Sequence, residues 1–213
     1  MPARHLLHVL LVPMLVLAPA CGSSGGGPTE RTLTFPSVPE LDGIVFSNGE
    51  VLVVGGGPLV GDSDCITNGV GIRMILCFDI SQIPPGSTIV AATLRVPIEG
   101  SVGPPPYATH GDLIVDHVTL TGSLGVQHYA GSTVALDIGT LSTNAQTVWK
   151  EMGVTGAVQA DFAATRTRSA YRLHFSNVDS NSDGECNGLL VNDGADHYQS
   201  GRIPSLDVTY VGP

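Results

Sequence analysis

The chain has 213 residues, a length that is typical of one domain together with an export segment. It carries 19 acidic and 9 basic residues, and the net charge of −10 excludes nucleic acid as a partner, because that needs clustered basic residues. Hydrophobic residues make up 42%, which excludes a disordered chain. With 27 Gly and 15 Pro, the chain is rich in turns and poor in helix formers.

Residues 1–20 have the features of a signal peptide. Arg4 gives a positive start, residues 6–17 form an apolar run, and Ala18, Pro19 and Ala20 are the small residues of a cleavage site. The run is too short to span a hydrocarbon core of about 30 Å comfortably. We therefore expect export and removal of residues 1–20.

Cys21 comes directly after this segment, which resembles a bacterial lipoprotein signal. The resemblance implies that Cys21 becomes the first mature residue and carries acyl chains, which attach the protein stably to a membrane. Gly22 implies sorting to the outer membrane or the cell surface. Residues 21–30 then form a flexible tether rich in Gly and Ser. The alternative is a cleaved secretory peptide that leaves a spare cysteine.

Residues 31–213 are predicted to form one domain made of strands and turns. Apolar residues alternate or come in short runs between Gly, Pro, Asn and Asp, which is typical of antiparallel strands. The spacing of these runs predicts an all-β, antiparallel β-sandwich with at most one short helix, at residues 156–164. The expected strands cover residues 44–46, 51–54, 73–80, 88–98, 113–120, 134–138, 171–175, 189–191 and 206–210.

Three segments carry a family resemblance. Residues 77–95 read CFDISQIPPGSTIVAATLR, residues 154–158 read VTGAV, and residues 202–210 read RIPSLDVTY. In this order they resemble the DNRLRE-type domain, which is similar to the family 96 carbohydrate-binding modules. The resemblance implies a β-sandwich of the jelly-roll type on a secreted or surface protein, and polysaccharide binding without catalysis. Within the first segment, the residues themselves predict that Asp79 caps a turn.

The cysteines predict one disulfide. If Cys21 is acylated, Cys65, Cys77 and Cys186 remain, and at most one pair can form. Cys65 and Cys186 lie in polar loops, whereas Cys77 lies within an expected strand, so we expect the Cys65–Cys186 pair and a buried Cys77 thiol. The alternative pair is Cys65–Cys77.

The loop around Asp179 resembles the front half of a calcium-binding loop. Asp179, Asn181 and Asp183 place oxygens at alternate positions, and Glu185 follows Gly184. We expect a structural calcium ion bound by Asp179, Asn181, Asp183 and Glu185. The alternative is an ordinary surface turn, since the same residue types are common in turns.

No specific catalytic pattern is present, although His110 and His117 lie close to acidic residues in the sequence. A hydrolase is therefore a minor alternative. Aromatic side chains in polar loops often contact sugars, and Tyr107, Tyr129 and Tyr198 are such residues. We expect a non-catalytic, lipid-anchored surface module that binds an extracellular polysaccharide or glycan. The negative net charge predicts that this ligand is either neutral, or acidic and bound in a calcium-dependent way. The alternative is a structural or protein-interaction module of the cell envelope.

Overall fold

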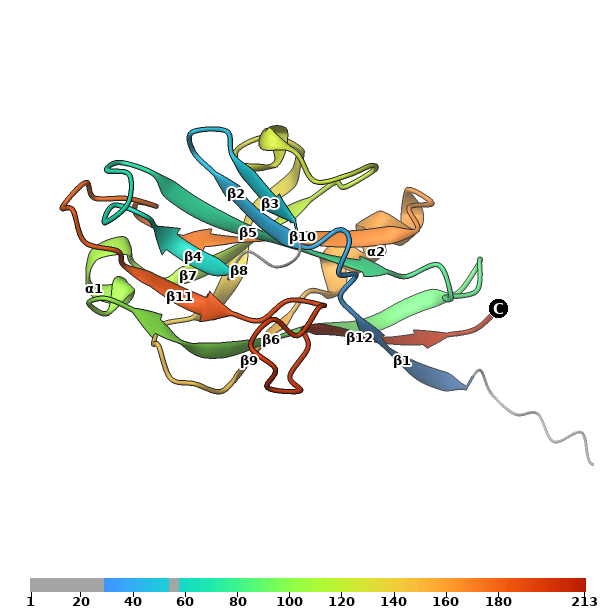
Figure 1. The fold of residues 1–213 in the computed structure, drawn as a ribbon. Coiled ribbons are helices and arrows are strands. Elements are labelled where there is room, and N and C mark those ends of the chain that lie inside the picture. Colours follow the sequence, from blue (N-terminus) through green and yellow to red (C-terminus); the bar gives the residue numbers. More distant parts are fainter. Residues whose placement is uncertain (1–28, 54–57) are drawn as a thin grey trace, which may run out of the picture.

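The computed structural model describes residues 29–53 and 58–213. The predicted signal peptide, Cys21 and most of the tether lie outside the described residues, as does Val54 at the end of an expected strand. Figure 1 shows two layers of antiparallel strands, so the all-β sandwich of jelly-roll type is confirmed. The strands are β1 (Glu30–Pro36), β2 (Gly43–Phe46), β3 (Val51–Val53), β4 (Leu59–Asp62), β5 (Gly71–Asp79), β6 (Thr88–Val102), β7 (Leu113–Val118), β8 (Thr133–Ser142), β9 (Trp149–Gly153), β10 (Arg168–Phe175), β11 (Gly188–Val191) and β12 (Ser205–Val211).

One layer contains β1, β12, the first part of β6, and β9 (Figure 1). β1 pairs with β12 from Glu30 opposite Val211 to Pro36 opposite Ser205, so the first strand begins one residue before the predicted start of the domain. The other layer follows the order β11-β4-β5-β10-β7-β8, and β2 and β3 add to β5. The long strand β6 joins both layers, because its last residues pair with β11.

The main core lies between the two layers. Met74, Leu76 and Phe78 of β5 are fully buried there, together with Leu94 of β6 and Val208 of β12. The opposite face of β5 is also covered, because a second cluster encloses its alternate residues. That cluster contains Val45, Ile75, Cys77, Val118, Leu120, Leu124 and Ala170. A strand that is buried on both faces reads as a continuous apolar run, as residues 74–78 do.

The predicted helix is present as α2 (Thr155–Ala163). Val154 and Val158 are buried in the main core, and Phe162 packs against it, so the predicted spacing of four residues is borne out. The prediction of at most one short helix is wrong, because a second short helix, α1 (Pro106–His110), is present. One 3₁₀ turn, η1 (Val126–His128), was not predicted either. Consecutive prolines before α1 read as a turn in the sequence, yet proline is also well tolerated in the first helical turn.

The predicted disulfide joins Cys65 and Cys186, whose Cα atoms lie 4.9 Å apart, and Cys77 is a buried free thiol. The bridge links residues 121 positions apart and stabilises the fold by about 4–5 kcal/mol if its effect is to restrict the unfolded chain. The predicted cap is also present, because Asp79 Oδ1 accepts a hydrogen bond from the Ser81 amide at 2.9 Å. Over the described ranges, no helix has the length and apolar character needed to cross a membrane.

Candidate functional site

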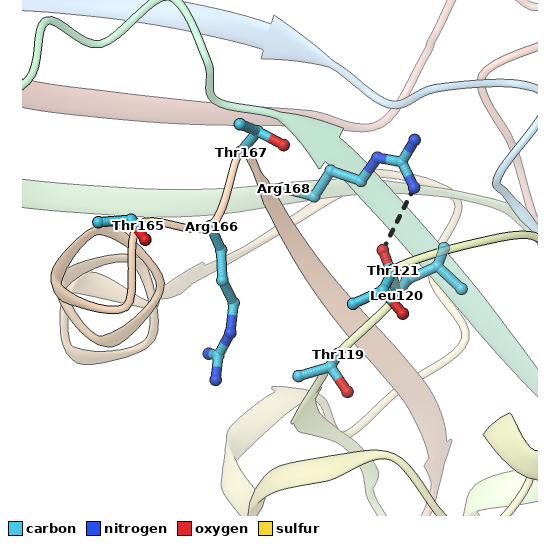
Figure 2. Close-up of a pocket in the computed structure, with 7 residues that line it drawn as sticks. All are labelled: Thr119, Leu120, Thr121, Thr165, Arg166, Thr167 and Arg168. Carbon is cyan, nitrogen blue, oxygen red and sulfur yellow. Dashed lines mark hydrogen bonds between the residues drawn. The ribbon is translucent and has the colours of Figure 1, made fainter.

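A polar cleft opens at the end of the sheet where β7 and β10 separate. Its volume is about 310 Å³, and its walls are residues 119–121, which follow β7, and residues 165–168, which lead into β10. Figure 2 shows the two segments facing each other. We call this feature the Thr/Arg cleft, and it is lined by Thr119, Leu120, Thr121, Thr165, Arg166, Thr167 and Arg168.

Strand pairing brings the two walls together. β7 and β10 are antiparallel neighbours with Val118 opposite Ala170, so the residues just beyond the paired region come from both segments. Leu120 is buried beneath the cleft in the second apolar cluster, which holds one wall in place. The walls lie more than forty positions apart in the chain, so their contact depends on the order of strands in the sheet.

Arg166 is held in the cleft by a buried carboxylate. Its Nη1 atom lies 2.8 Å from Asp161 Oδ1, and its backbone amide donates to the Asp161 carbonyl at 2.9 Å. The Asp161 side chain is 1% exposed, whereas that of Arg166 is 33% exposed. Because one end of the guanidinium is fixed and the side chain still reaches solvent, Arg166 has donors left for a ligand.

The positive charge of Arg168 is less neutralised by its neighbours than that of Arg166. Its Nη1 atom donates to the carbonyl oxygens of Leu120 at 3.3 Å and Gly122 at 3.4 Å. Within the described residues it forms no ion pair with a carboxylate, although Asp79 lies opposite it in β5. A guanidinium that is held by neutral carbonyls keeps its full charge, which suits binding of a carboxylate, sulfate or phosphate group.

Thr165 turns the chain out of α2 in a strained conformation. Its φ angle is +55°, which is unfavourable for a β-branched residue, and its amide donates to the Phe162 carbonyl at 3.0 Å. Beyond residues 165–167 lies a second cavity of about 220 Å³. Phe162, Ile80, Ile83 and Pro85 supply apolar walls to it. A polar cleft and an apolar cavity therefore share one short segment.

Asp161 also connects the Thr/Arg cleft to a third cavity. Its Oδ2 atom lies 2.8 Å from His117 Nε2, and both side chains are 1% exposed. His117 lines a cavity of about 250 Å³ that lies against α2, with Val134, Ile138 and Ala157 in its walls. One carboxylate therefore holds the cleft arginine with one oxygen and a buried histidine with the other.

The histidines near acidic residues in the sequence have separate partners in the structure. His117 contacts Asp161, and His110 lies beside Asp62. Asp116 instead accepts hydrogen bonds from Arg172 Nη2 at 2.6 Å and contacts His174 Nε2 at 3.0 Å. Burial would raise the pKa of Asp116, but the bonds from His174, the Asp137 amide and Arg172 outweigh it and lower that pKa. In the part of the chain that is described, none of these histidines hydrogen-bonds a serine hydroxyl. The non-catalytic assignment stays a prediction.

The three tyrosines predicted to contact a ligand are half-buried and have different neighbours. The Tyr107 ring packs against Phe175 with centroids 5.6 Å apart. Tyr129 donates to Asp179 Oδ2 at 2.9 Å, and Tyr198 donates to the Pro58 carbonyl at 3.1 Å. Burial raises the pKa of each of these tyrosines to about 12. They do not line the Thr/Arg cleft, and their role in binding stays a prediction.

The predicted calcium ligands take part in contacts within the protein. Asp179 Oδ2 pairs with Arg73 Nη2 at 2.6 Å, so this oxygen already has a cationic partner within the protein. Asp183 accepts hydrogen bonds from Asn181 Nδ2 at 2.7 Å and from the Glu185 amide at 2.8 Å. Across residues 29–53 and 58–213, no group of three or more His, Cys, Asp or Glu side chains is placed to bind a metal ion. A calcium ion at this loop stays a prediction.

Sequence reasoning missed the Thr/Arg cleft, although a signal was present. Residues 165–168 read TRTR, and this is where two basic residues lie closest together in a chain with only nine. The partner wall, residues 119–121, has no comparable signal, because it depends on strand order. No protein-family model matches the chain, and no curated protein matches it either, so the resemblance to DNRLRE-type domains also stays a prediction.

Proposed function

We propose that the protein is a non-catalytic, lipid-anchored surface module that binds an extracellular polysaccharide in the Thr/Arg cleft. The observation that supports this proposal is the arrangement of two arginines and four threonines around one concave site of about 310 Å³. Hydroxyl and guanidinium groups donate hydrogen bonds, and the acidic substituents of sugars accept them. The preferred ligand is a polysaccharide that carries carboxylate or sulfate groups.

The local charge of the cleft favours this choice over a neutral glycan. The whole chain has a net charge of −10, which repels polyanions at long range in low salt. Arg168, however, has no carboxylate partner among the described residues, and Arg166 shares its charge with the buried Asp161. A short-range attraction at two arginines can therefore select an acidic sugar unit, while the acidic surface keeps the overall affinity weak. Such binding does not require calcium.

Affinity electrophoresis tests the proposal, with a polyuronate, a sulfated polysaccharide and a neutral glucan in separate gels. We expect the acidic polymers to slow the protein and the Arg168→Ala variant to bind them about 10- to 100-fold more weakly, since a charged hydrogen-bonding group is lost. The matched control is Arg31→Ala, which removes an exposed arginine on β1 outside the cleft and changes the net charge equally.

Equal losses in the two variants would show that only the net charge matters and would contradict the cleft assignment. Equal retardation by the neutral glucan would contradict the preference for acidic sugars. Release of oligosaccharides during incubation would make the protein an enzyme. Repeating the gels with calcium or a chelator separates direct binding from calcium bridging.

A protein-interaction role in the cell envelope is the second candidate, and the edge strand β8 favours it. β8 ends the larger layer, and its Leu136 and Val134 side chains are 67% and 38% exposed. Exposed apolar residues on an open strand edge are typical of a surface that pairs with another chain. Absence of retardation on every polysaccharide would favour this second role.

A further inference from the structure

Four of the buried polar atoms that have no hydrogen-bond partner among the described residues belong to three side chains at one end of the sandwich, away from the Thr/Arg cleft. They belong to Asp62 at the end of β4, His110 at the end of α1, and Asn187 just before β11. The three side chains are at most 1% exposed. Asp62 Oδ2, both ring nitrogens of His110, and Asn187 Oδ1 form no hydrogen bond with any described residue. Leaving such atoms unpaired is costly, so the group calls for an explanation.

The backbone places Asp62 and Asn187 side by side. The Asn187 amide donates to Asp62 Oδ1 at 2.8 Å, and the Asp62 amide donates to the Asn187 carbonyl at 3.0 Å. These residues continue the pairing of β4 with β11, in which Gly61 lies opposite Gly188. Side chains of directly opposed residues project on the same face of a sheet. Asp62 Oδ1 is therefore satisfied by the backbone, and Oδ2 is left for another partner.

His110 and Asp62 are close together but are not hydrogen-bonded. His110 Nε2 lies 3.1 Å from Asp62 Oδ2, yet the two groups lack the orientation of a hydrogen bond. Two other histidine–aspartate contacts give the comparison. His117 with Asp161 at 2.8 Å and His174 with Asp116 at 3.0 Å both have hydrogen-bond geometry. Among the histidine–aspartate contacts of the described residues, the His110–Asp62 contact is the one that lacks hydrogen-bond geometry.

We propose that Asp62 Oδ2, His110 Nε2 and Asn187 Oδ1 bind a divalent transition-metal ion, zinc in the first instance. Two ligand atoms bound to one zinc ion at about 2.1 Å lie roughly 3.0–3.4 Å apart, and the observed separation of 3.1 Å falls in this range. Imidazole favours zinc over calcium, and a carboxylate and an amide oxygen complete a mixed donor set. The third ligand, Asn187, is an amide. Metal centres are usually recognised by three or more His, Cys, Asp or Glu side chains, and this site has two of them, His110 and Asp62.

The position of the ion explains what it does for the fold. Asn187 follows Cys186, and Asp62 lies near Cys65, so the site and the disulfide hold the same two loops. His110 adds α1 to this group. α1 also contacts the sheet through the packing of His110 and Tyr107 against Phe175, and the His110 carbonyl accepts a hydrogen bond from the Asn177 amide at 3.0 Å. The ion therefore fixes α1 to the ends of β4 and β11. The site shares no residue with the Thr/Arg cleft.

The first experiment uses the purified protein after treatment with a chelator. Zinc is added back, and native mass spectrometry measures the number of bound ions while thermal unfolding measures the melting temperature. We expect one zinc ion per chain and a rise in melting temperature of about 5–10 °C at zinc concentrations 100-fold above Kd. Calcium, titrated in parallel, tests the separate prediction at Asp179. Absence of bound zinc would overturn the proposal.

Substitutions then locate the ion. Asp62→Asn keeps an oxygen that accepts from the Asn187 amide but removes the charged ligand, and we expect at least about 100-fold weaker zinc binding. The matched control is Asp161→Asn, which alters the hydrogen-bonded pair with His117 and should leave zinc binding unchanged. Unchanged zinc affinity in Asp62→Asn, or an equal loss in both variants, would overturn the assignment.

A measurement on the unsubstituted protein keeps the test decisive if Asp62→Asn does not fold. Cobalt replaces zinc at such sites and shows visible absorption bands that report on its ligands. We expect the bands to appear with one equivalent of cobalt and to disappear with one equivalent of zinc. X-ray absorption at the zinc edge should then show one imidazole per ion. A different number of imidazoles would contradict the proposed ligand set.

Discussion

Thr165 has a strained backbone conformation and lines the Thr/Arg cleft. Its φ angle of +55° costs about 1–2 kcal/mol for a residue with a β-branched side chain. Glycine is the usual residue where a helix ends in this conformation. Thr165 nevertheless places a hydroxyl-bearing side chain in the wall of the cleft, beside Arg166 and Thr167 (Figure 2). Strain of this kind is common where a side chain serves binding.

We expect Thr165→Gly to raise the free energy of unfolding by about 1 kcal/mol, because glycine adopts a positive φ without strain. The melting temperature should rise by about 2–4 °C, measured by thermal denaturation. The control is Thr167→Gly, which also makes the unfolded chain more flexible but relieves no strain. Equal destabilisation by both substitutions would refute the role of the left-handed conformation.

At the scale of elements, buried acidic side chains connect segments that are distant in the sequence. Asp42, in the loop before β2, accepts hydrogen bonds from the Cys77 amide of β5 and from the Gly194 amide after β11, both at 2.9 Å. Burial raises the pKa of Asp42 to about 7 and outweighs the lowering effect of these hydrogen bonds. The same carboxyl therefore links three segments and makes their association depend on pH.

The pH dependence has a definite sign. In the unfolded chain Asp42 loses its proton near pH 3.8, whereas in the folded protein it keeps the proton up to about pH 7. The folded state then binds more protons between these values, so stability falls as the pH rises. We expect the free energy of unfolding of the wild type to fall by up to about 4 kcal/mol between pH 4 and pH 7, relative to that of Asp42→Asn. Urea denaturation at each pH measures both values. A difference that does not change with pH would rule this out.

At the scale of the whole molecule, the two proposed sites lie on different strand pairs of the larger layer (Figure 1). The Thr/Arg cleft lies where β7 and β10 separate, and the proposed zinc site lies where β4 and β11 meet α1. If Cys21 is acylated as predicted, the glycine-rich tether after it would hold this body away from the membrane.

The anchor is tested in the cell that exports the protein. We expect the wild type to remain in the membrane fraction after a high-salt wash and to be released by detergent, because acyl chains bind through apolar area. Cys21→Ser should be released in soluble form, while Ser23→Ala serves as the neighbouring control. Mass spectrometry of the wild type should find acyl chains on Cys21. Retention of Cys21→Ser in the membrane fraction would contradict the lipoprotein prediction.

The sequence by itself determined the features that depend on neighbouring residues. Alternating apolar residues predicted most of the strands, the spacing of Val154, Val158 and Phe162 predicted α2, and the polar loops around Cys65 and Cys186 predicted their disulfide. Three strands, β1, β4 and β9, and the helix α1 were missed because their local signals are weak or conflict. β4 and β9 are short, β1 has only Leu33 and Phe35 as alternating large apolar residues, and prolines precede α1. Periodicity is a local property of the chain, so it survives without knowledge of the fold.

Only the tertiary structure decided which distant residues meet. The Thr/Arg cleft exists because β7 and β10 are neighbours, and Asp161 joins Arg166 to His117 because α2 packs beside them. The proposed zinc site likewise needs β4 opposite β11, with α1 closing over both. Strand order in an antiparallel sandwich follows from the packing of two whole layers. Residue spacing therefore cannot predict such contacts.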